Sequence, residues 1–269
     1  MIDEVVIAVV VPAFNEERWI DEVIDSMPGF VDQIVVVDDR SLDGTAEFVR
    51  LKCAEDSRVL LVCHETNRGV GAAIISGYRA ALLAGAQVVA VMAGDGQMDP
   101  SELRGLVEPL LLGRADYVKG NRFKHRRRWD MPLQRLLGSA LLAKLTSLAA
   151  GVPVGDSQCG YTAIGRRALK ALQLDDIWRG YGYPNDLLGA LAAAGMAIAE
   201  VPVRPVYRGE QSGLRPWHMA TIALLIARVG LRRVGAGLAD ANEQSSVQSS
   251  DGSGRLRGAE AAIVGARSC

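Results

Sequence analysis

Short aliphatic runs alternate with segments of helical spacing over the first 112 residues of the chain. Residues 5–11 form a continuous aliphatic run, which is typical of a strand that is buried on both faces of a sheet. Further runs follow at residues 34–37, 59–62 and 88–92. This alternation predicts an α/β fold built on a doubly wound, mostly parallel sheet.

Helices are predicted between these strands and after the last of them. Residues 19–27 have apolar side chains at helical spacing, residues 45–53 begin at an Asp-Gly-Thr capping sequence, and residues 71–84 are rich in alanine. Pro100 stands where a further helix would begin, and the first turn of a helix tolerates proline. We therefore expect helices to flank the sheet.

The second half of the chain is less regular. Residues 117–119 and 197–201 have the composition of short strands, whereas residues 133–148 and 185–194 have that of helices. A last helix is predicted over residues 219–234, with arginines toward one side. Such a helix suits either packing against the domain or contact with an anionic membrane surface.

Composition limits the classes of function. The net charge of −1 and the 5% of aromatic residues argue against a nucleic-acid partner. The four cysteines show no CxxC spacing and the N-terminus has no basic segment, so we expect a cytoplasmic protein with reduced thiols. The apolar run at residues 219–227 is too short to span a bilayer of about 30 Å. Residues 239–269 are rich in Asn, Gln, Ser and Gly, and we expect a disordered tail after one domain, residues 1–238.

Asp95 stands out among the polar residues that follow the expected strands. It comes shortly after the run at residues 88–92 and lies between Gly94 and Gly96, which let a large ligand approach the backbone. In open α/β sheets, ligands bind at the carboxyl ends of the strands. A divalent cation that bridges a diphosphate needs one or two carboxylates, so Asp95 is a candidate metal ligand. A turn before a helix that begins at Pro100 accounts for Asp99, but it does not explain the two glycines around Asp95.

Two other segments follow strands or begin helices. Asp38 and Asp39 end the second expected strand, where a carboxylate either accepts hydrogen bonds from a base and a ribose or closes a turn. Gly69-Val70-Gly71 lacks the third glycine of a dinucleotide fingerprint, and no acid lies about 20 residues further on. An NAD-dependent oxidoreductase is therefore disfavoured.

Three later segments each allow two interpretations. The basic cluster formed by Arg122 and residues 124–128 is either a solvated loop or a clamp for an anionic group. Asp186 either caps a helix or supplies a general base. Residues 207–215 are polar and rich in glycine, which suits either a plain connection or a lid with anion-binding arginines.

Taken together, these segments resemble the family 2 glycosyltransferases of GT-A fold, and among them the polyprenyl-phosphate, dolichol-phosphate mannose synthase-like branch. The resemblance runs from about residue 5 to residue 217. It rests on the combined order of PAFNEE, VVDDRSLDGT, NRGVGAA, GDGQMDP, KGNRF, DSQCGYTAI, YPNDLL and YRGEQS. It implies a single GT-A (Rossmann-like) domain in which residues 1–112 bind the nucleotide and residues 113–238 bind the acceptor.

The resemblance also implies roles for individual residues. Donor binding would involve Pro12, Phe14, Glu16, Asp39, Arg68, Gly71, Asp95 and Gln97. Phosphate or acceptor binding would involve Arg122, Arg126, Ser212 and Arg215. Asp95 would hold a divalent metal ion, Mg²⁺ or Mn²⁺, on the donor diphosphate, and Asp186 would be the candidate base.

The chain departs from the family pattern at two positions. Ala93 replaces the first acid of the Asp-x-Asp signature, so metal binding would rest on Asp95, with Asp99 or Gln97 as further candidates. Pro184 stands where an acid is common in the family. An acceptor that is already a phosphate is ionised at neutral pH and needs little help from a base.

The activity implied is that of a metal-dependent hexosyltransferase. It would move a hexose from a UDP- or GDP-sugar to a polyprenyl phosphate, with inversion, in the cytoplasm or on the inner face of the membrane. Two alternatives stay open: the same donor chemistry on a soluble small-molecule acceptor, and a sugar-nucleotide-binding protein with impaired catalysis. Contact with a membrane surface and assembly into a homo-oligomer also stay open.

Overall fold

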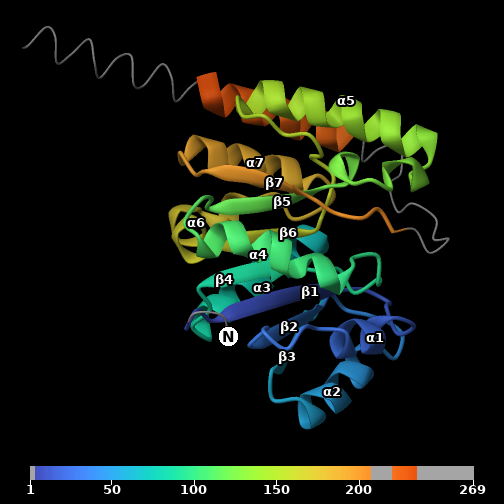
Figure 1. Cartoon of the computed structure of the whole chain (residues 1–269). Coiled ribbons are helices and arrows are strands. Elements are labelled where there is room, and N and C mark those ends of the chain that lie inside the picture. Colours follow the sequence, from blue (N-terminus) through green and yellow to red (C-terminus); the bar gives the residue numbers. More distant parts are fainter. Residues whose placement is uncertain (1–3, 207–219, 235–269) are drawn as a thin grey trace, which may run out of the picture. The chain divides into compact units, whose positions relative to one another are not determined.

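The computed structural model describes residues 4–206 and 220–234, and the described residues up to Gly230 form one compact unit around a seven-stranded sheet (Figure 1). The strands are β1 (Ile7–Ala13), β2 (Gln33–Asp38), β3 (Val59–Cys63), β4 (Val88–Val91), β5 (Tyr117–Asn121), β6 (Thr162–Gly165) and β7 (Ile198–Pro202). Their order across the sheet is β3-β2-β1-β4-β6-β5-β7. Strand β6 runs antiparallel to β4 and β5, and the other pairs are parallel.

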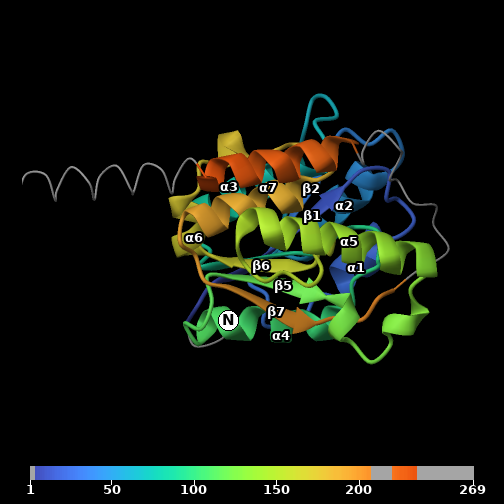
Figure 2. The same cartoon turned by 90° about the horizontal axis from the view of Figure 1, so that it is seen from above.

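Helices cover both faces of this sheet (Figures 1 and 2). They are α1 (Ile20–Asp25), α2 (Thr45–Glu55), α3 (Val70–Leu83), α4 (Leu103–Leu111), α5 (Leu133–Ala150), α6 (Arg166–Ala171), α7 (Tyr183–Ala193) and a last helix over residues 220–234. Helices α1, α2 and α4 pack into one apolar core, and α3, α6 and α7 pack into a second core on the opposite face. Every residue of β1 is buried, because both cores cover it.

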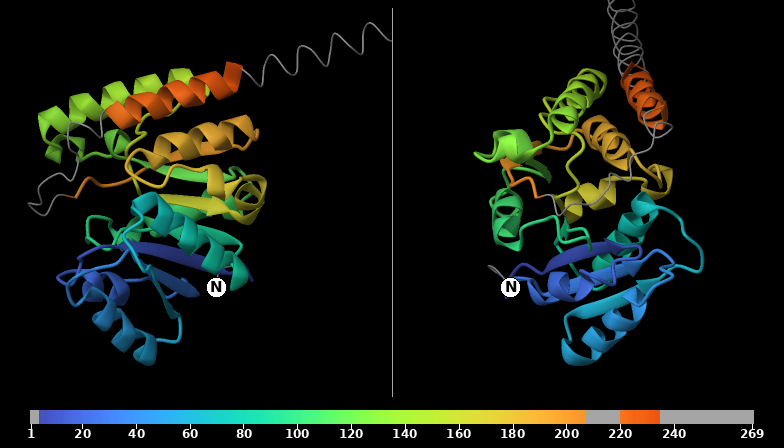
Figure 3. Two further views of the ribbon diagram at one scale, coloured as in Figure 1. Left: turned by 180° about the vertical axis from the view of Figure 1, so that it is seen from behind. Right: turned by 90° about the vertical axis from the view of Figure 1, so that its right-hand side faces the viewer.

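A further helical layer lies outside α7. Helix α5 packs against α7, and residues 220–230 of the last helix lie against the same side (Figure 3). Val229 is in direct contact with Gly189 of α7, and Leu225 with Gly182 at its start. No helix within residues 4–206 and 220–234 is long and apolar enough to cross a membrane.

The expected mostly parallel α/β sheet is confirmed, and the differences are local. The sequence prediction missed β6, which has four residues and is paired on both sides by strands distant in sequence. It also missed the short helix α6. The expected disordered tail, residues 239–269, and the expected lid with Ser212 and Arg215 lie outside the described residues.

Candidate active site

A cavity of about 410 Å³ lies at the carboxyl ends of three neighbouring strands, β1, β2 and β4. Its lining is Pro12, Ala13, Phe14, Glu16, Asp39, Asn67, Gly69, Val70, Ala73, Ala93, Asp95 and Tyr181. Parallel strands place their carboxyl ends at one edge of the sheet, which is where open α/β sheets bind ligands. The cavity, here named the donor cavity, therefore brings together Pro12, Phe14, Glu16, Asp39 and Asp95 as the sequence predicts.

Asp39 is a buried carboxylate that organises one wall of the donor cavity. Its Oδ1 accepts hydrogen bonds from the backbone N–H of Arg68 at 2.8 Å and contacts His64 Nδ1 at 2.6 Å. Its Oδ2 accepts from the backbone N–H of Gly69 at 2.7 Å. A carboxylate offers about four acceptor positions, so three contacts leave capacity for one more donor, such as a base N–H.

Asp95 lies between two cavities. It lines the donor cavity and also a smaller one of about 180 Å³, which Gln97 and Arg122 line as well. Its Oδ1 accepts a hydrogen bond from the backbone N–H of Gln97 at 3.0 Å, which closes a turn just after β4. The half-buried Asp95 side chain therefore lies at the boundary between these two cavities.

A second large cavity, of about 570 Å³, adjoins the donor cavity, and we name it the acceptor cavity. The two share Pro12, Val70, Ala93 and Tyr181. Polar side chains that line the acceptor cavity include Arg122, Gln134, Arg135, Ser139 and Gln158, and apolar ones include Ile74, Val91, Met98 and Leu142. The site thus combines basic groups with an apolar surface.

Arg122 is held in place by a buried acid. Its Nε donates to Asp156 Oδ2 at 2.7 Å and its Nη2 to Asp156 Oδ1 at 3.0 Å, while the Asp156 side chain is fully buried. Burial alone would raise the pKa of Asp156, but the hydrogen bonds and charge of Arg122 hold this pKa below its usual value. The result is a fixed, bidentate ion pair at the edge of the acceptor cavity.

Several residues with a predicted role lie elsewhere. Arg68 is exposed, and the interaction that ties it to the site is its backbone N–H to Asp39. Gly71 is a packing position, because a Cβ there would come within 2.5 Å of the Trp178 carbonyl oxygen. Arg126 is exposed and is not among the residues that line the described cavities.

Asp186 lies inside the protein, where its side chain does not reach either cavity. It is fully buried in α7 and does not line the donor or acceptor cavity. Its Oδ2 accepts a hydrogen bond from the backbone N–H of Trp178 at 2.8 Å and lies 3.9 Å from Arg228. These contacts hold the segment that carries Tyr181, which lines both cavities.

Sequence reasoning missed other residues of the acceptor cavity. Arg135, Ser139 and Leu142 lie on one face of α5, with the spacing i, i+4, i+7. That spacing is visible in the sequence, but leucines elsewhere on the helix dominate the apolar pattern. Tyr181 and Gln158 come from loops, and their proximity to the site depends on tertiary structure.

The fit of a divalent metal can be judged from these side chains. Within residues 4–206 and 220–234, no group of three His, Cys, Asp or Glu side chains is arranged to bind a metal by itself. Asp95 lines the donor cavity, so its carboxylate could supply one of the ligands of a metal ion there. One carboxylate together with substrate phosphates is a ligand set that Mg²⁺ accepts. The residues fit a metal ion that shares its coordination with a bound diphosphate.

The comparisons with known proteins agree with this geometry. Residues 8–172 match the model of the family described as glycosyl transferase family 2. The chain belongs to this family. One relative of this glycosyltransferase is the UDP-N-acetylglucosamine–dolichyl-phosphate N-acetylglucosaminyltransferase of Methanococcus voltae. The two sequences are 30% identical over 215 residues, which cover 75% of this chain and 86% of that protein. The chain is also 31% identical over 203 residues to the undecaprenyl-phosphate mannosyltransferase of Micrococcus luteus, covering 74% and 83%.

Solved structures show the same fold. Glucosyl-3-phosphoglycerate synthase of Mycobacterium tuberculosis in complex with phosphoglyceric acid matches with a TM-score of 0.63 at 28% identity, over 84% of this chain and 81% of that one. The same enzyme with Mn²⁺ and UDP-glucose matches with a TM-score of 0.55 at 26% identity, over 84% and 80%. The expected GT-A fold and the resemblance to the polyprenyl-phosphate branch of the family are confirmed.

Proposed function

We propose that this family 2 glycosyltransferase transfers a hexose from a UDP-sugar to a polyprenyl phosphate, with inversion at the transferred carbon. The observation that carries the proposal is the pair of adjoining cavities with a shared wall. One cavity is lined by three acids, of which Asp39 suits a nucleotide base and Asp95 a diphosphate with its metal ion. The other combines two arginines with apolar side chains, which suits a phosphate on a hydrocarbon chain.

In the donor cavity, Asp39 would accept a hydrogen bond from the base, next to Pro12, Phe14 and Glu16. Asp95, with Gln97 beside it, would hold the divalent metal ion that binds the donor diphosphate. The structural relative from M. tuberculosis was crystallised with Mn²⁺ and UDP-glucose, which supports a metal and UDP here. When bound, the metal supplies positive charge that favours departure of the diphosphate.

In the acceptor cavity, Arg122 and Arg135 would bind the acceptor phosphate, and Leu142 and Ile74 would contact the first carbons of its chain. A phosphate oxygen is already ionised at neutral pH, so it attacks the sugar without losing a proton to the protein. We therefore propose that Asp186 orders the segment around Tyr181 rather than acting as the base. The basic side chains would stabilise charge at the transferring group.

We also propose that the exposed side of α5 rests on a membrane surface, which is where a polyprenyl phosphate resides. Its leucines 133, 137, 141, 145 and 148 recur every three or four residues and are 44–76% exposed. Trp129, 70% exposed, and the exposed Arg126, Arg127 and Arg128 precede the helix. An apolar helix face with aromatic and basic neighbours is typical of peripheral membrane contact. Other residues of α5, among them Arg135, Ser139 and Leu142, line the acceptor cavity.

Replacing Leu137 and Leu141 by Glu should therefore weaken vesicle binding strongly. The leucines are 63% and 61% exposed, so the change costs little fold stability. Each buried leucine contributes about 1.5–3 kcal/mol, so affinity should fall at least about tenfold. Flotation with phosphatidylglycerol vesicles measures this.

A matched control carries the same change at Leu83 and Leu112, which are also exposed but lie on α3 and just after α4. This control should bind vesicles as the unaltered protein does. Equal loss in both double variants, or no vesicle binding by the unaltered protein, would contradict the assignment of α5.

The proposed activity is tested by a panel of UDP- and GDP-hexoses in a thermal-shift assay, with and without Mn²⁺ or Mg²⁺. A ligand that binds the native state raises the unfolding temperature. The donor found is then offered with undecaprenyl phosphate and, separately, with phosphoglyceric acid, which is bound in a crystal structure of the relative. We expect transfer to the lipid. Transfer to phosphoglyceric acid alone would favour a soluble acceptor, and binding without any transfer would favour a protein with impaired catalysis.

A further inference from the structure

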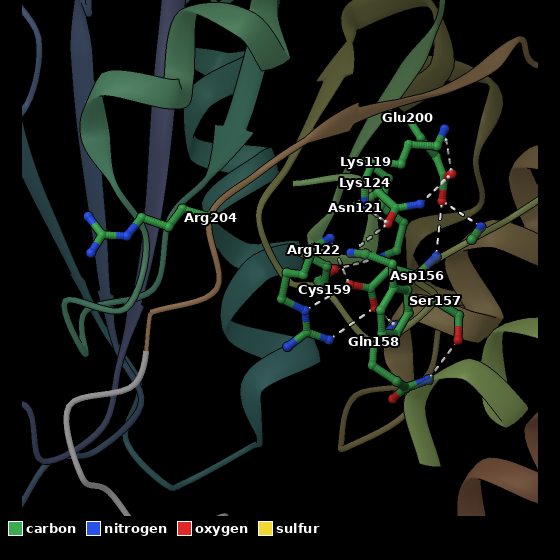
Figure 4. A network of polar contacts seen from close by, with 12 residues as sticks. Lys119, Asn121, Arg122, Lys124, Asp156, Ser157, Gln158, Cys159, Glu200 and Arg204 are labelled. Atoms are coloured by element: carbon green, nitrogen blue, oxygen red, sulfur yellow. Dashed lines mark hydrogen bonds and ion pairs between the residues drawn. The ribbon is translucent and has the colours of Figure 1, made fainter. Parts of the chain in front are cut away.

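Glu200 is an acid of β7 whose side chain is 8% exposed and whose carboxylate joins two separate segments (Figure 4). Its Oε1 accepts hydrogen bonds from the backbone N–H groups of Gly155 at 2.7 Å and Asp156 at 3.1 Å. Its Oε2 accepts from Asn121 Nδ2 at 2.8 Å and lies 3.1 Å from Lys124 Nζ. A single side chain thus ties the segment around residue 122 to the segment around residue 156.

The first of these segments carries Arg122. Asn121 directly precedes it, and its Oδ1 accepts hydrogen bonds from the backbone N–H groups of Phe123 at 2.9 Å and Lys124 at 3.2 Å. These bonds close the 3₁₀ turn η2 (Arg122–Lys124). Because Glu200 holds the other end of the Asn121 amide, it fixes the turn from which the Arg122 side chain projects.

The second segment carries the acid that orients Arg122. The backbone of Asp156 donates to Glu200, and its side chain forms the bidentate pair with the Arg122 guanidinium. At the far end of this segment the fully buried Lys119 donates its Nζ hydrogen to the carbonyl oxygen of Cys159. Burial lowers the pKa of Lys119. The segment that carries Asp156, the acid that orients the Arg122 guanidinium, is therefore held by Glu200 at Asp156 and by Lys119 at Cys159.

The packing around Glu200 leaves little room for another arrangement. A Cβ at Gly155 would come within 2.3 Å of Asn121 Nδ2 and 3.0 Å of Glu200 Oε2. The backbone must approach this closely for its N–H to reach the carboxylate. A continuous chain of contacts therefore runs from Glu200 through Asp156 to Arg122, and Figure 4 shows these three residues in one network.

We propose that Glu200 is a positioning residue for the acceptor phosphate, acting through Asp156 and Asn121 on the Arg122 guanidinium. The inference rests on the proposed function, because it takes Arg122 as a phosphate-binding group. Glu200 lines none of the three cavities described above, so its effect on a ligand must pass through these neighbours.

The test is the Glu200→Gln variant, with farnesyl phosphate as a short acceptor probe. Glutamine has the same size, but its NH₂ group must face either the two backbone N–H donors or the donors on Asn121 and Lys124. The dissociation constant for farnesyl phosphate, measured by calorimetry, should rise about tenfold because Arg122 is misplaced. Binding of farnesol, which lacks the phosphate, and of UDP should stay within about twofold.

Arg122→Lys is the reference variant, since it keeps a cation beside buried Asp156 but loses the bidentate geometry. This variant should raise the dissociation constant for farnesyl phosphate about tenfold. If Glu200 acts through Arg122, the double variant should also lose about tenfold rather than the hundredfold product. Lys124→Gln is the matched control: it removes the half-exposed ion pair to Glu200, leaves the other three contacts, and should change binding by less than about twofold.

The possible outcomes separate the two proposals. Wild-type-like binding of farnesyl phosphate by Glu200→Gln, a multiplicative loss in the double variant, or equal losses for UDP and farnesol would each overturn the positioning role. A wild-type protein that binds UDP but not farnesyl phosphate would overturn the proposed acceptor and this inference together. Should Glu200→Gln not fold, Glu200→Asp, which keeps the charge but is too short to reach both segments, is expected to show the same phosphate-selective loss.

Discussion

The Asp95→Asn variant should keep its fold and lose nearly all transfer of sugar. An asparagine Oδ1 still accepts the hydrogen bond from the Gln97 N–H at 3.0 Å, so the turn after β4 is preserved. The amide has no negative charge with which to hold a metal ion on the donor diphosphate. We expect kcat to fall by about 10²- to 10³-fold, the range seen when one group that stabilises transition-state charge is removed.

Two measurements check this expectation: the rate of transfer to undecaprenyl phosphate, and the thermal shift produced by UDP with and without Mn²⁺. Asp99→Asn is the matched control, because Asp99 accepts from the Ser101 N–H at 3.0 Å and caps the 3₁₀ helix η1 (Pro100–Glu102). It should transfer sugar at nearly the normal rate. Normal activity of Asp95→Asn, or the same loss in both variants, would remove Asp95 from its assigned role.

Replacement of Asp39 by Ala should lower both stability and nucleotide affinity. The change leaves His64 and the backbone N–H groups of Arg68 and Gly69 without their acceptor in a buried site. Leaving buried donors unsatisfied should cost roughly 3 kcal/mol in the free energy of unfolding, measured in urea. Because Asn67 and Gly69 line the donor cavity, the affinity for UDP should fall by about tenfold or more, measured by calorimetry.

Asp38→Asn provides the comparison. Asp38 is the neighbouring buried acid, but its contacts to the Ser41 N–H are long, at 3.3 Å. It is expected to lose about 1 kcal/mol or less and to bind UDP almost normally. If Asp39→Ala is destabilised but binds UDP with an unchanged dissociation constant, Asp39 supports the wall of the cavity without reading the base.

The strands predicted from aliphatic runs are the part of the fold that local sequence describes well. Strands β1, β2 and β4 are covered on both faces, so their central residues are apolar on both sides. Helix α5 was also predictable from its leucines, but their exposure was not. A helix pattern shows that one side is apolar without showing what covers that side.

The residues of the candidate site also differ in how well local sequence predicts their positions. Asp39 and Asp95 follow strands, so the sheet's topology places them at one edge whatever the side chains around them. Asp186 and Gly71 match sequence motifs, yet the first is buried against the Trp178 backbone and the second packs against its carbonyl group. A motif identifies a position in the chain, whereas the direction of its side chain depends on packing by distant segments.

The sequence by itself determined the order of the first four strands with their helices, the membership of a glycosyltransferase family and the edge of the sheet at which Asp39 and Asp95 lie. The hydrophobic periodicity of a segment, and the residues that directly follow a strand, can be identified from neighbouring residues in the sequence alone. Only the tertiary structure decided the acceptor cavity and the support of Arg122 by Asp156 and Glu200. Asp156 lies 34 positions from Arg122 and 44 positions from Glu200 along the chain. The pairing of β5 with β7, which no local pattern encodes, brings Glu200 close to the end of β5, where Arg122 follows.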